Sequence, residues 1–378
     1  MNENPDRGGG GEGDGDDDGE RESTLELEYR PFSLELATSL ETAGGTIDSR
    51  DGFLVRITDT AADGDEAAVG YGEATPLAGW TESLEDCEAA LERASDEIRT
   101  SPAAALEAAD RQVAARHAIA LALADLQATR EATPLYRYVG QGPMVGRVPV
   151  NATIGDGSPS ETVHDVSDAV ERGFDCCKLK VGRRSVEADI ERVRRTRSAV
   201  GPEVELRVDA NEAWTYNEAV TALEAFGELD VSILEQPLPA GSLAGHADLR
   251  EHEGGEGVQI ALDEGFLEHG VDAICEAQAA DAVVLKPMAL GGVDVARKAA
   301  AWVQELEITP IVTTTIDGVV ARTAAVHLAA SIPDVPACGV ATAELLASDL
   351  GRDPVLLEKG SAVVPQAKGL GVEGVWTE

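Results

Sequence analysis

Residues 176–182, with the sequence CCKLKVG, form the segment on which the prediction of the fold depends. The segment is short, apolar and strand-like, yet it contains Lys178 and Lys180, two of only six lysines in the 378-residue chain. Arginine supplies the other 24 of the 30 basic residues, and no lysine precedes this segment. Two lysines one residue apart in a chain that otherwise uses arginine indicate that the chemistry of the amine is needed here.

Similar short apolar segments continue beyond residues 176–182, separated by segments rich in Ala, Glu and Arg. The residues at their ends recur at intervals of 23 to 29, which fits a repeat of strand, helix and two loops. Eight strands alternating with helices predict a (β/α)8-type barrel, and a doubly wound sheet is less favoured because no strand opens into a glycine-rich dinucleotide turn. The predicted strands are VPVNATIG (148–155), CCKLKVG (176–182), ELRVDAN (205–211), VSILEQP (231–237), VQIALDE (258–264), AVVLKPM (282–288), TPIVTTTI (309–316) and ACGVAT (337–342).

The part of the chain before the barrel does not alternate strands with helices; its predicted strands come first and its helices follow. Residues 25–36, 52–60 and 67–77 are predicted to be strands, and residues 82–132 have helical character. They predict a small antiparallel sheet followed by helices. From Pro354 the chain again resembles strands, which we expect to pack on this first sheet.

The chain therefore divides into four predicted regions. Gly and acidic residues with almost nothing to bury predict a disordered tail at the start. The regions are the acidic tail (1–23), an α+β domain (24–140), the barrel (141–350) and a C-terminal segment that returns to the α+β domain (351–378).

The net charge of −40 argues against nucleic acid and anionic membrane surfaces as partners, because both are negatively charged. Such repulsion is tolerated in concentrated salt, where the screening length falls to roughly 3 Å. We therefore expect a halophilic source. With no apolar run of about 18 residues and no signal peptide, we expect a cytoplasmic protein.

The five cysteines have no repeating spacing and are predicted to be reduced and mostly buried. For the adjacent pair Cys176 and Cys177, a redox or metal function is the alternative to the favoured role as small core residues.

Charged side chains follow the predicted strands at the end where barrel enzymes build their sites. In chain order these are Lys180, Asp209, Glu235, Asp263 and Lys286. Three carboxylates meeting at one point repel one another, and a divalent cation relieves that repulsion. Oxygen ligands without His or Cys favour Mg²⁺, with Mn²⁺ as a possible substitute. The alternative is that the carboxylates are ordinary helix caps.

The lysines flank the carboxylates on both sides. Lys178 and Lys180 share one face of a strand because side chains repeat every two residues, and Lys286 lies across the barrel rim. Two amines facing a metal-bound carboxylate suit abstraction of a proton α to that carboxylate. The alternative is that the lysines only form salt bridges with the carboxylates.

Five motifs in this order resemble the enolase superfamily, specifically its muconate lactonizing subgroup. They are Lys178-Leu179-Lys180, Asp209-Ala210-Asn211, Glu235-Gln236-Pro237, Asp263-Glu264 and Lys286-Pro287, and the resemblance runs from about Tyr29 to Val375. It implies a modified (β/α)7β barrel of the TIM type, with an N-terminal α+β capping domain that the C-terminal segment completes.

The resemblance also implies roles for individual residues. Asp209, Glu235 and Asp263 would bind Mg²⁺, Lys180 would be the catalytic base and Lys286 the opposite catalytic lysine. Supporting roles fall to Lys178, Asn211 and Glu264, and substrate contacts are expected at Thr314, Asp317 and Gly291. The expected partner is a small carboxylate substrate, and the chain is a candidate homo-oligomer. His327 is predicted to be a core residue.

Within the subgroup, residues 30–36 and 70–91 resemble the o-succinylbenzoate synthases. These lyases dehydrate 2-succinyl-6-hydroxy-2,4-cyclohexadiene-1-carboxylate in menaquinone biosynthesis. The acidic Asp-x-Asp of the epimerases is replaced here by residues 338–342 (CGVAT). Asp317-Gly318 departs from the Glu-Ser of the synthases. The alternatives are an N-acylamino acid racemase or dipeptide epimerase, a muconate cycloisomerase, and a non-catalytic barrel with a structural metal site.

Overall fold

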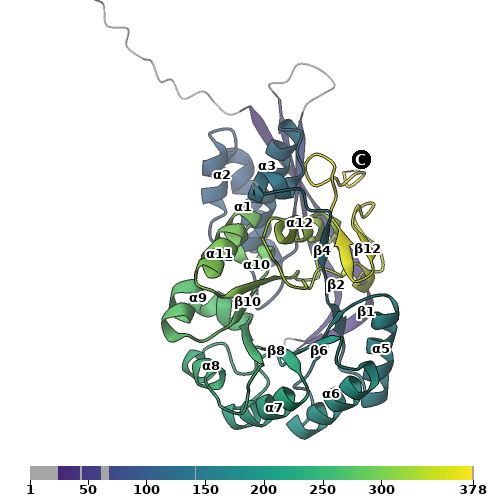
Figure 1. The fold of residues 1–378 in the computed structure, drawn as a ribbon. Helices are drawn as coiled ribbons and strands as arrows, with labels where there is room; N and C mark the ends of the chain where they lie inside the picture. The colour runs from purple at the N-terminus through teal and green to yellow at the C-terminus, as the bar shows by residue number, and fades with distance from the viewer. Residues whose placement is uncertain (1–23, 43–44, 61–67, 141, 377–378) are drawn as a thin grey trace, which may run out of the picture.

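The chain folds into an α/β barrel with a smaller α+β cap beside it (Figure 1). The fold is that of a computed structural model, which describes residues 24–42, 45–60, 68–140 and 142–376. The predicted acidic tail, residues 1–23, lies outside the described residues.

The cap begins with a three-stranded antiparallel sheet in the order β1-β2-β3. Helices then follow in sequence, as the change from alternating to helical character predicts. The bounds are β1 Leu25–Thr42, β2 Gly45–Asp59, β3 Val69–Ala74, α1 Leu84–Glu97, α2 Pro102–Ala108, α3 Val113–Arg130 and α4 Leu135–Gly140.

Strand β3 lies directly against helix α3 because it carries glycine where the two backbones meet. A Cβ atom on Gly72 would lie 1.9 Å from the carbonyl oxygen of Ala118, and one on Gly70 would lie 2.1 Å from that of Ala122. Both distances are far below van der Waals contact, so only glycine allows this approach. The end of β3 leads into the loop that reaches the barrel, and this packing therefore fixes where that loop starts.

The barrel contains a seven-stranded parallel sheet in the order β11-β10-β9-β8-β7-β6-β5. Its strands are β5 Ala152–Ile154, β6 Cys176–Lys180, β7 Glu205–Asp209, β8 Val231–Glu235, β9 Gln259–Leu262, β10 Ala282–Leu285 and β11 Thr309–Val312. The helices between and after them are α5 Pro159–Glu171, α6 Val186–Val200, α7 Tyr216–Glu228, α8 Leu243–Arg250, α9 Glu264–Ala277, α10 Pro287–Leu290, α11 Val293–Glu305 and α12 Val319–Ala330.

Two of the predicted barrel strands differ from the structure. Residues 148–155 divide into β4 (Arg147–Pro149) and β5, because β4 pairs antiparallel with β13 (Ser361–Val363) while β5 pairs parallel with β6. Residues 337–342 form only isolated bridges, from Cys338 to Val150 and from Gly339 to Thr313. These bridges join the two edges of the seven-stranded sheet and so close the (β/α)7β barrel.

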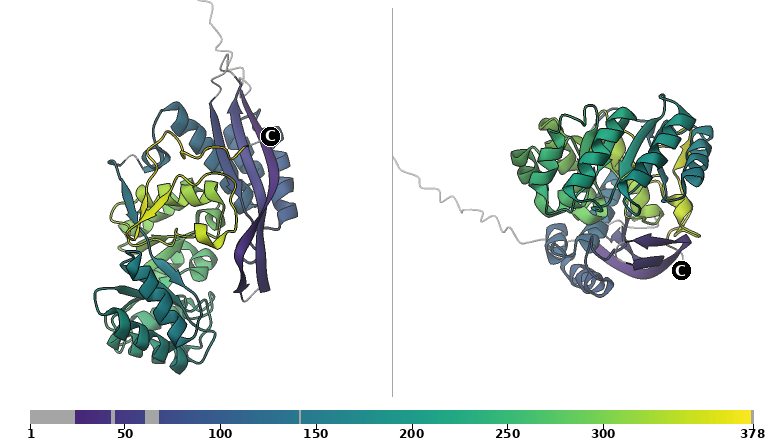
Figure 2. Two further views of the ribbon diagram at one scale, coloured as in Figure 1. Left: turned by 90° about the vertical axis from the view of Figure 1, so that its right-hand side faces the viewer. Right: turned by 90° about the horizontal axis from the view of Figure 1, so that it is seen from below.

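The C-terminal segment contains the predicted strands, which pair outside the cap sheet. After a short 3₁₀ helix at Ala343–Leu345, strand β12 (Leu356–Glu358) pairs with β13, and β13 pairs with β4. The chain contacts the cap sheet where Leu346 bridges Leu36 of β1, and again at its last described residues (Figure 2).

Two cation–π contacts and a hydrogen bond hold this end of the chain. The Trp376 ring lies against the guanidinium groups of Arg30 and Arg56, at 5.0 and 4.5 Å, and Arg30 also donates to the carbonyl oxygen of Val375. The cap is thus built from both ends of the chain.

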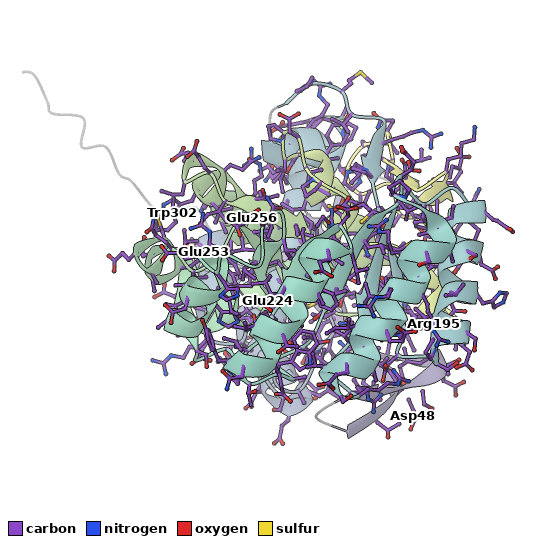
Figure 3. The ribbon with its side chains drawn as sticks, turned by 60° about the horizontal axis from the view of Figure 1, so that its bottom comes forward. Asp48, Arg195, Glu224, Glu253, Glu256 and Trp302 are labelled. Carbon is purple, nitrogen blue, oxygen red and sulfur yellow. The ribbon has the colours of Figure 1, made fainter. Side chains whose placement is uncertain are left out.

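The outer surface of the barrel carries acidic side chains such as Glu224, Glu253 and Glu256 (Figure 3). Among the described residues, no helix is both long and apolar enough to cross a membrane.

We predict that Gly72→Ala destabilises the protein, because the added methyl group must displace the backbone of α3. The expected loss is about 1–3 kcal/mol in the free energy of unfolding, the usual cost of overpacking. Gly155→Ala is the matched control, since a Cβ atom there meets nothing within 4 Å. Urea titration followed by circular dichroism measures both, and equal stabilities of the two variants would contradict the packing argument.

Candidate active site

Strand ends bring the predicted charged residues together on one rim of the barrel. Lys180 ends β6, Asp209 ends β7 and Glu235 ends β8, and these three residues are paired side by side in the sheet register. Asp263 follows β9 at the start of α9, and Lys286 follows β10 at the start of α10. The repeat of strand and helix therefore places all five at the same end.

Ion pairs connect the lysines of β6 with the carboxylates. Lys178 donates to Asp209 at 3.0 Å and to both oxygens of Glu235 at 2.9 and 3.1 Å. Lys180 donates to Asp209 at 2.6 Å and to the side-chain oxygen of Asn211 at 2.8 Å. The Lys178 side chain is 14% exposed and that of Lys180 is 35% exposed. Lys180 is thus the more accessible of the two amines.

Lys286 lies on the other side of the carboxylates and makes two contacts. Its amine donates to Asp263 at 2.6 Å and sits 3.3 Å from the centre of the Trp80 ring. Trp80 belongs to the loop that follows β3 in the cap. Sequence reasoning missed it, because a single tryptophan in a loop has neither strand-end position nor spacing to mark it.

Burial and the neighbouring lysines shift the pKa values of the carboxylates Asp209 and Glu235 in opposite directions. Burial disfavours the charged form of Asp209, but Lys178 and Lys180 outweigh it and hold the pKa of Asp209 below its usual value. Burial and the neighbouring Asp209 carboxylate raise the pKa of Glu235 to about 8. Lys178, Lys180 and Lys286 each pair with at least one of the carboxylates Asp209, Glu235 and Asp263.

The residues fit a hard divalent cation in their chemistry. All the candidate ligands are carboxylate oxygens, and buried oxygens of Asp263 (Oδ1) and Glu264 (Oε2) have no hydrogen-bond partner. Among the described residues, no three His, Cys, Asp or Glu side chains are arranged around one point as metal ligands. The Lys178 amine bridges Asp209 and Glu235 instead. To bind one ion together, these carboxylates would have to turn from the ammonium groups toward it.

Asn211 and Glu264 support this arrangement through hydrogen bonds. The Asn211 amide nitrogen Nδ2 donates to Glu264 at 3.1 Å, and the backbone N–H of Asn211 donates to Asp209 at 3.0 Å. Burial and the nearby Asp263 raise the pKa of Glu264 to about 7. Gln236, which the sequence did not single out, accepts from the backbone N–H groups of Asp263 and Gly265 at 2.9 and 3.0 Å. It fixes the turn from β9 into α9.

The three predicted substrate contacts are engaged in interactions within the protein. The Gly291 N–H donates to the carbonyl of Met288 at 3.4 Å, so this amide closes α10. The Thr314 hydroxyl lies 3.0 Å from that of Thr342. Asp317 is buried and accepts from the Thr315 hydroxyl at 2.5 Å. The polar atoms of Asp317 and Gly291 thus complete turns in the structure, and their contact with a substrate stays a prediction.

Two buried charged residues of the cap, which sequence reasoning also missed, reach the barrel near Asp317. The Glu73 carboxylate accepts from the N–H groups of Gly318 and Ala321, at 2.6 and 3.0 Å, and so caps the start of α12. Arg50 donates to the carbonyl of Ile316 at 3.2 Å. Burial, with a contribution from Asp317, raises the pKa of Glu73 to about 7. These contacts hold the cap over the barrel rim.

His327 and four of the five cysteines are buried, and Cys275 is half-buried. His327 is buried, its Nε2 lies 3.2 Å from the carbonyl of Leu370, and burial lowers its pKa to about 4. All five cysteines are free, and burial raises the pKa of both Cys176 and Cys177. Thiols of that kind are poor nucleophiles.

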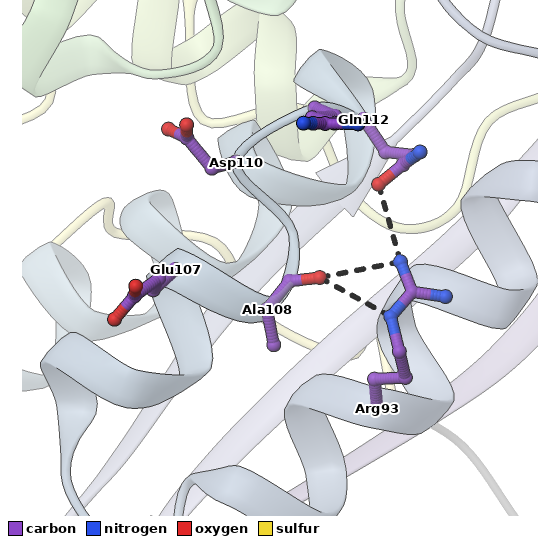
Figure 4. A pocket seen from close by; sticks show the side chains of 6 residues that line it. Arg93, Glu107, Ala108, Asp110 and Gln112 are labelled. Atoms are coloured by element: carbon purple, nitrogen blue, oxygen red, sulfur yellow. Dashed lines mark hydrogen bonds between the residues drawn. The ribbon is translucent and has the colours of Figure 1, made fainter.

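A separate depression in the cap is not a second candidate. Arg93 there donates to the carbonyl of Ala108 and to the side chain of Gln112 (Figure 4). The Arg93 guanidinium group pairs with polar groups of the cap helices. None of the barrel lysines or carboxylates lines this depression. The lining residues are Arg93, Glu107, Ala108, Asp110, Arg111 and Gln112.

Known proteins resemble the chain along nearly its whole length. The L-Ala-D/L-Glu epimerase of Bacillus subtilis is 28% identical over 93% of this chain and 96% of its own. The structure of its substrate-liganded complex superposes with a TM-score of 0.83 at 26% identity, over 93% of this chain and 99% of that one.

Two further relatives catalyse reactions that differ from each other. The o-succinylbenzoate synthase of Thermobifida fusca is 35% identical over 57% of this chain and 65% of its own. A dipeptide epimerase from Enterococcus faecalis V583, solved with Mg and the dipeptide L-Leu-L-Tyr, has a TM-score of 0.80 at 27% identity and covers 92% of this chain and 99% of its own.

The family match covers the barrel from within α5 onward and the end of the chain. Residues 161–376 match the enolase C-terminal domain-like family. This range includes every strand-end lysine and carboxylate described above, while the cap beside it has the position seen in the superposed structures. The chain belongs to the enolase superfamily.

Proposed function

We propose that the protein is a Mg²⁺-dependent enzyme that removes a proton α to a substrate carboxylate. In this proposal Asp209, Glu235 and Asp263 hold the ion, and Lys180 and Lys286 act from opposite sides of the substrate. The observation that carries the proposal is the placement of the lysines, which flank the carboxylates at Asp209 and at Asp263. Related structures solved with Mg support the choice of metal.

The accessible amine is the natural base. Lys180 is more exposed than Lys178, and its amine makes two hydrogen bonds, whereas the Lys178 amine contacts three carboxylate oxygens. Lys180 would take the α-proton, and the electron pair of the broken C–H bond would move into the carboxylate. When bound, the cation would neutralise the negative charge that develops there. Lys178 would stay as a fixed positive charge beside Asp209 and Glu235.

The fate of the deprotonated substrate separates two reactions. Lys286 can return a proton from the opposite face, which inverts the carbon and gives an epimerase or racemase. Alternatively, Lys180 can return its proton to a departing β-hydroxyl, which leaves as water and gives a dehydratase.

Epimerisation of a dipeptide or racemisation of an N-acylamino acid is the better supported reaction. The two epimerases described above match the chain over more than nine-tenths of its length, at 26–28% identity. Epimerisation is also consistent with Lys180 and Lys286 on opposite sides of one site.

Dehydration to o-succinylbenzoate is the second candidate. The sequence alone favours this reaction over epimerisation, and the comparisons reverse that order. One observation favours dehydration. The barrel closes at residues 338–342, CGVAT, without an acidic side chain to hold a substrate amine. A relative of this activity is 35% identical over part of the chain.

A direct assay separates the two reactions. The purified protein is incubated with Mg²⁺ and concentrated KCl in deuterated buffer, with L-Ala-L-Glu, N-succinyl amino acids or the cyclohexadiene carboxylate. Proton NMR reports loss of the α-proton signal and ultraviolet absorbance reports the aromatic product. Exchange with inversion supports the epimerase or racemase. Aromatic product supports the synthase, and neither result with any substrate would contradict the proposed function.

We predict that Lys180→Ala lowers turnover by about 10²–10⁴-fold, the usual contribution of a general base, with little change in folding. Lys298→Ala on α11 is the control, because that exposed lysine lies outside the site. For an epimerase, Lys286→Ala should block exchange from one stereoisomer only. Retention of full activity by Lys180→Ala would refute its assignment as the base.

We predict that MgCl₂ raises the melting temperature, because an ion that binds only the folded state stabilises it. At a hundred times the dissociation constant the gain is about 2.7 kcal/mol. Asp263→Asn should abolish the gain, while Glu256→Gln on the surface should keep it. Differential scanning calorimetry at constant ionic strength measures the shift, and an equal shift in Asp263→Asn would place the ion elsewhere.

A high-salt origin is also a proposal, and it rests on the net charge of −40. We predict that raising KCl from about 0.1 M to about 1 M increases the melting temperature, because the screening length falls from about 10 Å to about 3 Å. Sucrose is the uncharged control. A melting temperature that falls or stays constant in KCl would show that charge repulsion does not limit stability.

A further inference from the structure

The loop between β3 and α1 carries Trp80 and is anchored at its first end to both parts of the molecule. Arg50 donates to the carbonyl oxygens of Thr75 and Pro76, at 2.8 and 3.1 Å, where the loop leaves β3. The same guanidinium group donates to the carbonyl of Ile316 in the barrel. Arg50 is 3% exposed, so these bonds are shielded from water.

The second end of the loop is anchored to helix α3. The Glu82 carboxylate accepts from the backbone N–H groups of Ala114 and Ala115, at 3.0 and 2.9 Å. Within the loop, the Trp80 N–H donates to the carbonyl of Leu77 at 3.0 Å. The backbone that carries the indole ring is therefore held by hydrogen bonds on both sides of Trp80.

The segment after Lys286 is also held by the cap. Arg116 on α3 donates to the carbonyl of Gly291 and, through two nitrogens, to the carboxylate of Asp294 at 3.2 and 3.1 Å. Arg116 of the cap thus holds the segment after Lys286, and Trp80 of the cap contacts the Lys286 amine.

The contact between Trp80 and Lys286 has a chemical consequence. A lysine has a long, flexible side chain, and a tryptophan face attracts its ammonium group through the ring quadrupole. Asp263 is the other partner of this amine, and it is also a proposed ligand of the cation. If Asp263 turns toward an ion, the ring is the contact that continues to hold the amine.

We propose that Trp80 is a positioning residue whose ring holds the Lys286 amine where that lysine acts on the substrate. This inference rests on the proposed function, since it assigns a cap residue to the same site. Trp80 is half-buried and belongs to none of the hydrophobic clusters of the described core. Its ring is therefore placed for the ammonium group rather than for packing the interior.

The small number of lysines allows a test that does not depend on activity. Protein labelled with ¹³C at the lysine ε-carbon gives at most six signals, one for each lysine. We expect one ε-methylene signal to be displaced upfield by the indole ring, and Lys286→Met identifies it by its loss. Trp80→Leu should return this signal to the ordinary range. Trp302→Leu, which removes an exposed tryptophan of α11, should leave it displaced.

Kinetics then test the functional part of the proposal. Trp80→Leu should lower kcat by about ten- to a hundredfold with KM less affected, since misplacing a catalytic group by about 1 Å has effects of this size. Trp80→Phe retains an aromatic face and should recover most of the loss. Thermal melting confirms that each variant is folded.

The outcomes are distinguishable. An undisplaced Lys286 signal in the wild-type protein, or an unchanged kcat in Trp80→Leu, would overturn the proposal. A displaced signal in a wild-type protein that acts on no carboxylate would contradict the proposed function, while it would still support the contact between Trp80 and Lys286.

Discussion

The repulsion among buried carboxylates at the barrel rim is the constraint on which the rest of the site depends. Parallel strands of equal register must deliver Asp209 and Glu235 side by side, and Asp263 follows one strand later. Such a group is stable only with cations between its members. The two lysines of β6 supply them in the structure, and a divalent ion is proposed to supply them in the working enzyme. The scarcity of lysine elsewhere makes their placement here informative.

The cap completes the site through a small number of buried polar contacts. Glu73 caps helix α12 of the barrel, and Arg50 joins the Trp80 loop to the turn before that helix. Because these groups are buried, each hydrogen bond they make is costly to lose. The Arg50 hydrogen bonds that join the cap to the barrel also hold the loop that carries Trp80, whose ring contacts Lys286. The packing of cap against barrel and the geometry of the site are therefore linked.

Periodicity and strand-end position were enough to predict a barrel, the small sheet and helices before it, and the residues that the rim brings together, while the capping role of the first domain came from the family resemblance. These features repeat along the chain, so each strand supports the next. Trp80, Glu73 and Arg50 could not be predicted in this way, because they act across two regions that are distant in sequence and have no repeat. The substrate contacts at Gly291 and Asp317 stay predictions, because in the structure both residues use polar atoms to complete their own turns. The eighth strand was shorter than predicted because only Cys338 and Gly339 find partners.

The most direct test of the account is to locate a bound ion. Crystals grown with Mn²⁺, examined by anomalous diffraction, would show where a divalent cation binds. The account predicts one strong peak in contact with Asp209, Glu235 and Asp263, with the Lys178 and Lys180 amines turned away from the shared carboxylate oxygens. The absence of a peak there, with both lysines still bonded to Asp209 under saturating Mn²⁺, would contradict it.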